Sequence, residues 1–149
     1  MTAKEKQADL IKTYLKPTLK LWGYKTVGQN WWKDKGEFYS LLNLQNFSWN
    51  TKDAVDFCFN TGVVLKAGMG KSADKNPSAS NLTVYLREDF YLPDDRKEHE
   101  FRNKSGYVLT DNTNPVDFSS MLKTDFEDYI LPGLEKLDTL QESLDSFEN

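Results

Sequence analysis

The chain has 149 residues, of which 38% are hydrophobic and 28% charged, and its net charge is −4. This length and balance are typical of one globular domain with a sizeable core. No apolar run approaches the roughly 18 residues of a membrane span, and a lone cysteine excludes an internal disulfide. Residues 1–6 lead into a mixed helix and not into the apolar core of a signal peptide, so we expect a cytoplasmic protein.

The charge is divided unevenly along the chain. Residues 1–75 hold 12 basic and 7 acidic side chains, a balance of +5, whereas residues 76–149 hold 7 basic and 16 acidic, a balance of −9. An acidic half disfavours nucleic acid as a partner and favours a basic protein. The sequence leaves one alternative open, a solvated surface that only keeps the chain soluble.

The first predicted element is an amphipathic helix over residues 4–22. Its apolar side chains recur at near-helical spacing, with lysines on the opposite side: Leu10, Ile11, Tyr14, Leu15, Leu19 and Trp22. Pro17 lies inside this pattern and predicts a kink or a restart, and Gly23 is placed to end the helix. Short strands are expected next at residues 24–27 and 30–33.

Two long strands within residues 37–65 form the centre of the predicted fold, joined by a connection at residues 48–54. Because opposed residues share a face of a sheet, only one parity of register brings the two apolar sets together. In that parity the residues that share the apolar face are Leu42, Leu44, Phe57 and Phe59. The residues that share the opposite, amide-rich face are Asn43, Gln45, Asp56 and Asn60.

The second half of the chain begins with a predicted exposed, mobile loop over residues 66–81, which contains glycine and proline breakers. Further strands are expected at residues 82–87, 99–102 and 107–110, followed by a helix from about residue 117 that Pro132 and Gly133 break or bend. Residues 139–142 have the form of a capping box that opens a last short helix.

The predicted fold class is therefore α+β, with one domain over residues 1–149. We expect a single antiparallel sheet of about five to seven strands, with N-terminal and C-terminal helices packed on one face. Such an arrangement leaves the second face of the sheet partly exposed to water.

No catalytic, cofactor or metal site emerges from the residue patterns. Residues 67–72 end like a phosphate-binding loop, but Leu65 stands where that pattern requires a glycine, so a flexible loop is the better interpretation. Cys58 and His99 are too few for a zinc site, and their spacing does not indicate a nucleophile and its base. A carboxylate metal site is less well supported than a solvated turn; its candidate ligands are Asp94, Asp95 and Glu98.

The tryptophans divide between core and surface in this interpretation. Trp22 and Trp32 are predicted core residues because of their places on a helix and a strand, and Trp31 is left unassigned. Two alternatives stay open for Trp49, which either extends the amide-rich face or lies in a small cluster under a loop. Aromatic residues beside amides and acids suit a protein interface better than a nucleic-acid platform.

Several short stretches carry a resemblance to a known family. They are residues 15–25 (LKPTLKLWGYK), 30–33 (NWWK), 42–45 (LNLQ), 59–63 (FNTGV) and 130–134 (ILPGL). The first resembles the "P-x-L-K-x-x-G-F/Y-K" opening of the bacterial domain of unknown function numbered 4304, and the others are similar to its later motifs. The resemblance implies a small α+β fold and no particular activity.

These observations favour a non-enzymatic protein-binding domain. The most concrete version is a bacterial immunity or antitoxin-like protein that neutralises a basic effector, with no cofactor, nucleic acid or membrane involved. The predicted partner-binding residues are Asn43, Gln45, Trp49, Asp56, Asn60, Asp125 and Asp128. The alternative is an enzyme or small-ligand binder that uses the polar face of the sheet, which a deep pocket there would favour.

The two acidic residues in this set come from the expected C-terminal helix. On that helix Leu122, Phe126 and Ile130 are predicted to face the sheet, so Asp125 and Asp128 are expected to point largely to solvent. Exposed charges of this kind contribute little to folding, but they steer a basic partner and speed its association.

Overall fold

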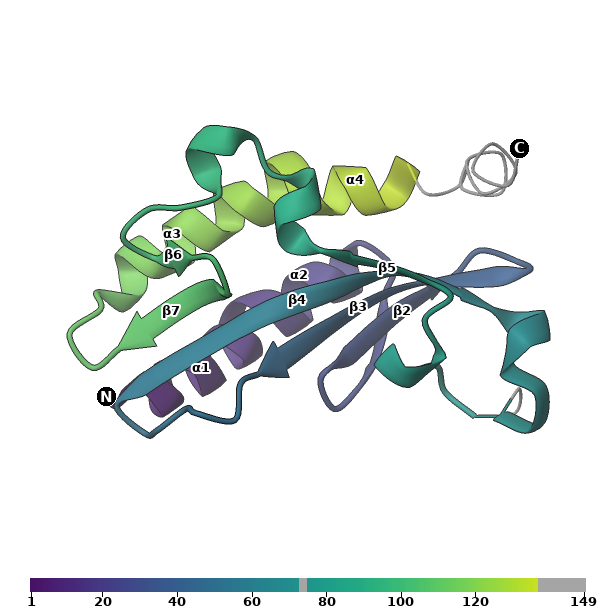
Figure 1. The fold of residues 1–149 in the computed structure, drawn as a ribbon, viewed down its shortest axis with the longest axis horizontal. Coiled ribbons are helices and arrows are strands. Elements are labelled where there is room, and N and C mark those ends of the chain that lie inside the picture. Colours follow the sequence, from purple (N-terminus) through teal and green to yellow (C-terminus); the bar gives the residue numbers. More distant parts are fainter. Residues whose placement is uncertain (73–74, 137–149) are drawn as a thin grey trace.

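The computed structural model describes residues 1–72 and 75–136 and confirms the predicted α+β class (Figure 1). The helices are α1 (Ala3–Leu10), α2 (Lys16–Leu21), α3 (Pro115–Thr124) and α4 (Leu131–Glu135). The strands are β1 (Lys25–Val27), β2 (Asn30–Asp34), β3 (Phe38–Asn46), β4 (Ala54–Leu65), β5 (Val84–Arg87), β6 (Arg102–Asn103) and β7 (Gly106–Thr110). The capping box expected at residues 139–142 lies outside the described residues.

The strands form one antiparallel sheet in the order β1-β2-β3-β4-β7-β6. The long strand β4 has β3 along one edge, and its other edge is shared between β7 at one end and β5 at the other. The register of β3 against β4 has the predicted parity, because Leu44 pairs with Phe59 and Asn43 pairs with Asn60. The apolar and the amide-rich faces therefore separate as expected.

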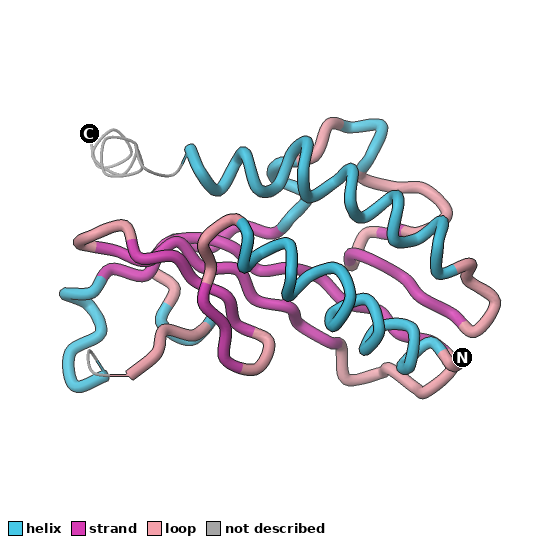
Figure 2. The backbone as a smooth tube through the Cα atoms, turned by 180° about the vertical axis from the view of Figure 1, so that it is seen from behind, coloured by secondary structure: helices cyan, strands magenta, loops and turns pink. Residues whose placement is uncertain are grey.

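Both helical segments cover the same face of the sheet (Figure 2). The other face carries no α-helix among the described residues, and only the 3-10 helical segment Lys66–Ser72 packs on one end of it, through Met69. The main core fills the space between these layers and includes Leu44, Phe57 and Phe59 from the sheet. Phe126, from the C-terminal helical segment, packs against Phe59 with ring centroids 4.8 Å apart. None of the described helices is long and apolar enough to span a membrane.

Each helical segment contains a π-helical turn shortly before a proline. These turns, Ile11–Leu15 and Asp125–Ile130, join α1 to α2 and α3 to α4. The residue before each proline donates its N–H to the carbonyl five positions earlier, as Lys16 does to Ile11. A proline lacks an N–H and its ring would clash with the carbonyl four residues before it, and the wider turn relieves both problems. The chain thus stays helical across Pro17 and across Pro132.

Three tryptophans occupy different places relative to the main core. Trp32 is buried as predicted, but in a small second cluster on the uncovered face, whereas its neighbour Trp31 lies in the main core. Trp22 is only half-buried and packs against the edge of the main core. Alternation along β2 explains why Trp31 and Trp32 lie on different faces, since adjacent strand residues point to opposite faces.

The loop after β4 has an apolar anchor that the sequence interpretation did not include. Met69 is buried in the second cluster, where it packs with Leu41 and Val64 from the sheet. Residues 73 and 74 lie outside the described part of the chain. The mobility of this loop stays a prediction.

Candidate functional site

The uncovered face of the sheet carries a connected set of amides in its centre. The side-chain amide of Asn60 donates to the amide oxygens of Asn43, at 3.1 Å, and of Gln45, at 2.9 Å. The Tyr85 hydroxyl donates to the Asn60 side-chain oxygen. Alternation in β3 and β4 places all three amides on this face, so the sequence correctly predicted which of these residues share it.

The amides bind one another, and one of them is withdrawn from solvent while Asn43 and Gln45 are half-buried. Asn60 is almost fully buried, and Asn43 receives a further partner from Asn30, at 2.9 Å. A buried polar group whose hydrogen bonds are all made stiffens its surroundings. Asn60, which donates twice and accepts from Tyr85, is thus a support for neighbouring side chains.

An aromatic stack borders this network at the start of β4. The rings of Phe47 and Trp49 lie parallel, with centroids 4.6 Å apart. The indole N–H of Trp49 donates to the Asp56 carboxylate at 2.7 Å. Trp49 is nevertheless 58% exposed. Of the two alternatives for Trp49, the structure favours extension of the amide-rich face.

Two residues of β5, the exposed Tyr85 and the half-buried Arg87, complete the surface. Arg87 pairs with Asn60 across the strands, and its guanidinium carbon lies 5.7 Å from the centroid of the Phe47 ring. Tyr85, which holds Asn60, is 52% exposed. We call Phe47, Trp49, Tyr85 and Arg87 the aromatic–arginine strip. The sequence predicted the strand that carries Tyr85 and Arg87, but it gave no information on where that strand pairs.

A close approach of β5 to β4 depends on Gly62. Its φ of +152° is one that residues with a side chain rarely adopt, and a Cβ there would lie 1.8 Å from the Val84 carbonyl oxygen. Gly62 pairs with Tyr85, so this glycine allows the strand that carries Tyr85 and Arg87 to lie against β4. A glycine inside an otherwise regular strand was the feature that could have indicated a close neighbour.

The two side chains considered for nucleophilic chemistry are occupied otherwise. Cys58 is buried beside the amide network, and burial raises the pKa of its thiol to about 11, so the thiolate is disfavoured at neutral pH. The His99 Nδ1 accepts the Phe101 N–H at 3.2 Å, and burial lowers the pKa of the imidazole. Among the described residues, no group of three or more histidine, cysteine, aspartate or glutamate side chains is arranged to hold a metal ion.

The predicted exposure of Asp125 is wrong. Its carboxylate is fully buried, accepts from the Tyr107 hydroxyl at 2.8 Å and forms a salt bridge with Arg96. Asp125 follows Leu122 by three residues and therefore lies on the buried side of the helix. Because Asp125 is charged, the sequence pattern made this buried side look narrower than it is. Asp128, in contrast, is exposed as predicted.

Asp125 belongs to a buried charge cluster that joins the C-terminal helical segment to the sheet. The Arg102 guanidinium lies over the Tyr107 ring, 4.4 Å from its centroid, and binds the Glu88 carboxylate at 3.2 Å. Burial raises the pKa of Glu88, an effect that Arg102 opposes, and it also raises the pKa of Tyr107. Each charge has a partner, which is what keeps such a cluster compatible with folding.

Comparison with known proteins gives one match. The model of the family described as Domain of unknown function (DUF4304) matches residues 15–136. No curated protein and no solved structure matches the chain.

Proposed function

The chain belongs to the family described as Domain of unknown function (DUF4304), and we propose that it is a protein-binding domain without enzymatic activity. The proposed contact surface is the aromatic–arginine strip together with Asp56, on the face of the sheet that the helices leave uncovered. The amides predicted to touch the partner, Asn43, Gln45 and Asn60, serve in this proposal as the rigid support beneath it.

The observation that carries the proposal is the exposure of large side chains that are already held in place. Tryptophan, tyrosine and arginine supply most of the strongest single contributions to protein–protein binding. Trp49 is fixed by its stack and its bond to Asp56, and Tyr85 by its bond to Asn60. Side chains ordered before binding lose little conformational entropy when a partner arrives.

The charge of the chain supports a basic partner. Residues 76–149 carry a balance of −9, and Asp128, Asp117 and Glu98 are among the exposed acids. Asp125 and Glu88 do not contribute, because both are buried with arginine partners. A bacterial immunity or antitoxin-like protein that neutralises a basic effector is the version of the proposal that fits this charge. Asn60 uses both its amide group and its oxygen in bonds to neighbouring side chains, which argues against the alternative of a small-ligand site centred on it.

The test is site-specific photocrosslinking in the native host. A benzoylphenylalanine in place of Trp49 is expected to give a discrete adduct on irradiation, and Tyr85→Ala in the same chain is expected to reduce its yield. Val116 provides the control position, because it is 71% exposed at the start of α3 and lies outside the strip. The proposal fails if position 49 gives no adduct, or if position 116 gives the same adduct in equal yield.

A further inference from the structure

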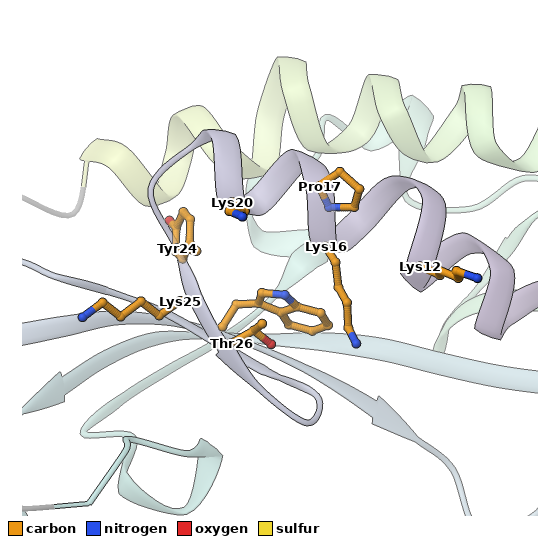
Figure 3. Close-up of a pocket in the computed structure, with 8 residues that line it drawn as sticks. Lys12, Lys16, Pro17, Lys20, Tyr24, Lys25 and Thr26 are labelled. Carbon is orange, nitrogen blue, oxygen red and sulfur yellow. The ribbon is translucent and has the colours of Figure 1, made fainter.

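A groove runs between the N-terminal helical segment and the β1–β2 hairpin, away from the uncovered face of the sheet (Figure 3). Its volume is about 680 Å³, within the range of ligand-binding clefts. The residues that line it are Lys12, Lys16, Pro17, Lys20, Tyr24, Lys25, Thr26 and Trp31. We call this the lysine groove.

The lysine groove concentrates positive charge on a protein whose net charge is −4. Lys12, Lys16 and Lys20 follow one another at intervals of four residues along the helical segment, and Lys25 extends from β1 at the other end of the groove (Figure 3). None of these four lysines forms a salt bridge with another residue in the described ranges 1–72 and 75–136. Lys25 interacts with Asp34 only beyond salt-bridge distance. Such a group of ammonium charges attracts an anion.

The residues at the floor of the groove indicate which class of anion it can bind. Trp31 is 1% and Tyr24 5% exposed, so neither ring offers a face on which a base can stack. Proteins that bind single-stranded nucleic acid combine lysines with such stacking platforms. A concave groove, moreover, does not match the flat surface of a membrane.

The groove also offers apolar contact between its charges. Pro17 and the edge of Trp31 lie along it, and the methylene stems of the lysines add to this surface. The Trp31 indole N–H has no acceptor among the described residues. The lining therefore suits a ligand that carries both negatively charged acceptors and apolar side chains.

We infer that the lysine groove binds an acidic peptide segment of a partner protein, one in which carboxylates alternate with apolar residues. Carboxylates pair with the row of lysines, and the apolar side chains pack against Pro17 and the lysine stems. Because the groove lies on the helical side of the molecule and the aromatic–arginine strip on the other, this inference does not depend on the proposed function.

The test is direct binding to the full chain. A short fluorescein-labelled peptide of glutamate, leucine and serine is titrated at low ionic strength and followed by fluorescence anisotropy. Lys16→Gln combined with Lys20→Gln is expected to weaken binding by between about twofold and about 25-fold, since each exposed ion pair contributes between about 1.4-fold and about fivefold. The difference is expected to shrink at high ionic strength, where exposed charges are screened.

The matched control is Lys104→Gln combined with Lys123→Gln, which changes the net charge equally at exposed positions outside the groove. This control is expected to bind the peptide like the unaltered chain. Equal weakening by both pairs would overturn the inference, because it would show attraction by overall charge alone. Tighter binding of a thymidine oligonucleotide, lost in the same groove variant, would also overturn it and identify the groove as a nucleic-acid site.

Discussion

At the scale of single residues, Asp125 shows that a charged side chain can be buried between a helix and a sheet. Asp125 lies beneath the helix because Arg96 and Tyr107 replace the water that its carboxylate would otherwise bind. Removal of one partner from such a pair leaves the other buried and uncompensated, which is why the pair matters more to stability than an exposed pair does.

Asp125→Asn is therefore expected to lower the free energy of unfolding by about 3 kcal/mol. Asp128→Asn, three residues further along the helix, is expected to change it by less than about 0.5 kcal/mol, because its side chain is exposed. Urea unfolding of both variants checks the prediction. Equal effects of the two substitutions would contradict the burial of Asp125.

Cys58 gives a second prediction at this scale, a loss of stability in alkaline solution. The thiol has an ordinary pKa of 9.0 and a folded pKa of about 11, so the unfolded chain releases its proton first. Stability contributed by a raised pKa is present below the unfolded value and is lost as the pH rises towards the folded value. From about pH 8 to about pH 10 the chain is expected to lose about 1 kcal/mol more than a Cys58→Ala variant. Identical losses in urea unfolding at the two pH values would contradict this.

At the scale of elements, the pairing of β5 with β4 decides whether the aromatic–arginine strip exists. Tyr85 and Arg87 reach the amide-rich face only because β5 lies against the second half of β4. That approach leaves no room for a side chain at Gly62. The backbone of one strand thus controls the surface presented by its neighbour.

Gly62→Ala is expected to lower the free energy of unfolding by about 3 kcal/mol, because the added side chain strains the backbone and clashes with β5. It is also expected to abolish the crosslink at position 49. Gly68→Ala is the matched control, since a Cβ there would meet no atom within 4 Å and its backbone conformation is not one that favours glycine. A Gly62→Ala variant as stable as the control would show that β5 can move away at little cost.

At the scale of the whole molecule, two surfaces of different chemistry lie on opposite sides of one core. The strip on the uncovered face combines aromatic rings with Arg87, and the lysine groove on the helical side is basic. Acidic side chains dominate the second half of the sequence. These negative charges would attract a basic partner before it contacts the strip, so they would act mainly on the association rate.

Asp117→Asn combined with Asp128→Asn is accordingly expected to slow association with the partner recovered by the crosslink at position 49. The effect is expected to be larger at low ionic strength, because salt screens charges that lie more than about 10 Å from the contact. Surface plasmon resonance across a salt series measures the two rates. An unchanged association rate at low salt would exclude steering by this helix.

The sequence predicted the fold better than the surface, and the reason is the range of the interactions involved. Alternation along β3 and β4 determines which residues share a face, so Asn43, Gln45 and Asn60 were placed correctly. The contacts of Asp125 with Arg96 and Tyr107 join residues 29 and 18 positions apart. The pairing of Tyr85 with Gly62 likewise joins distant residues, and no local pattern specifies either contact.

The two π-helical turns determine how each helical segment is rotated about its own axis. One residue of an α-helix corresponds to about 100° of rotation, so the wider turn shifts the sides of α1 and α2 relative to each other. This shift brings Leu10, Leu15 and Leu19 onto the same buried side, although five residues separate the first two. A single-residue deletion, which in a regular helix would turn one half away from the sheet, would here change the π turn into an α turn. Such a deletion between positions 11 and 15 would keep both helical halves facing the core, but it would also restore the clash between the Pro17 ring and the carbonyl four residues before it.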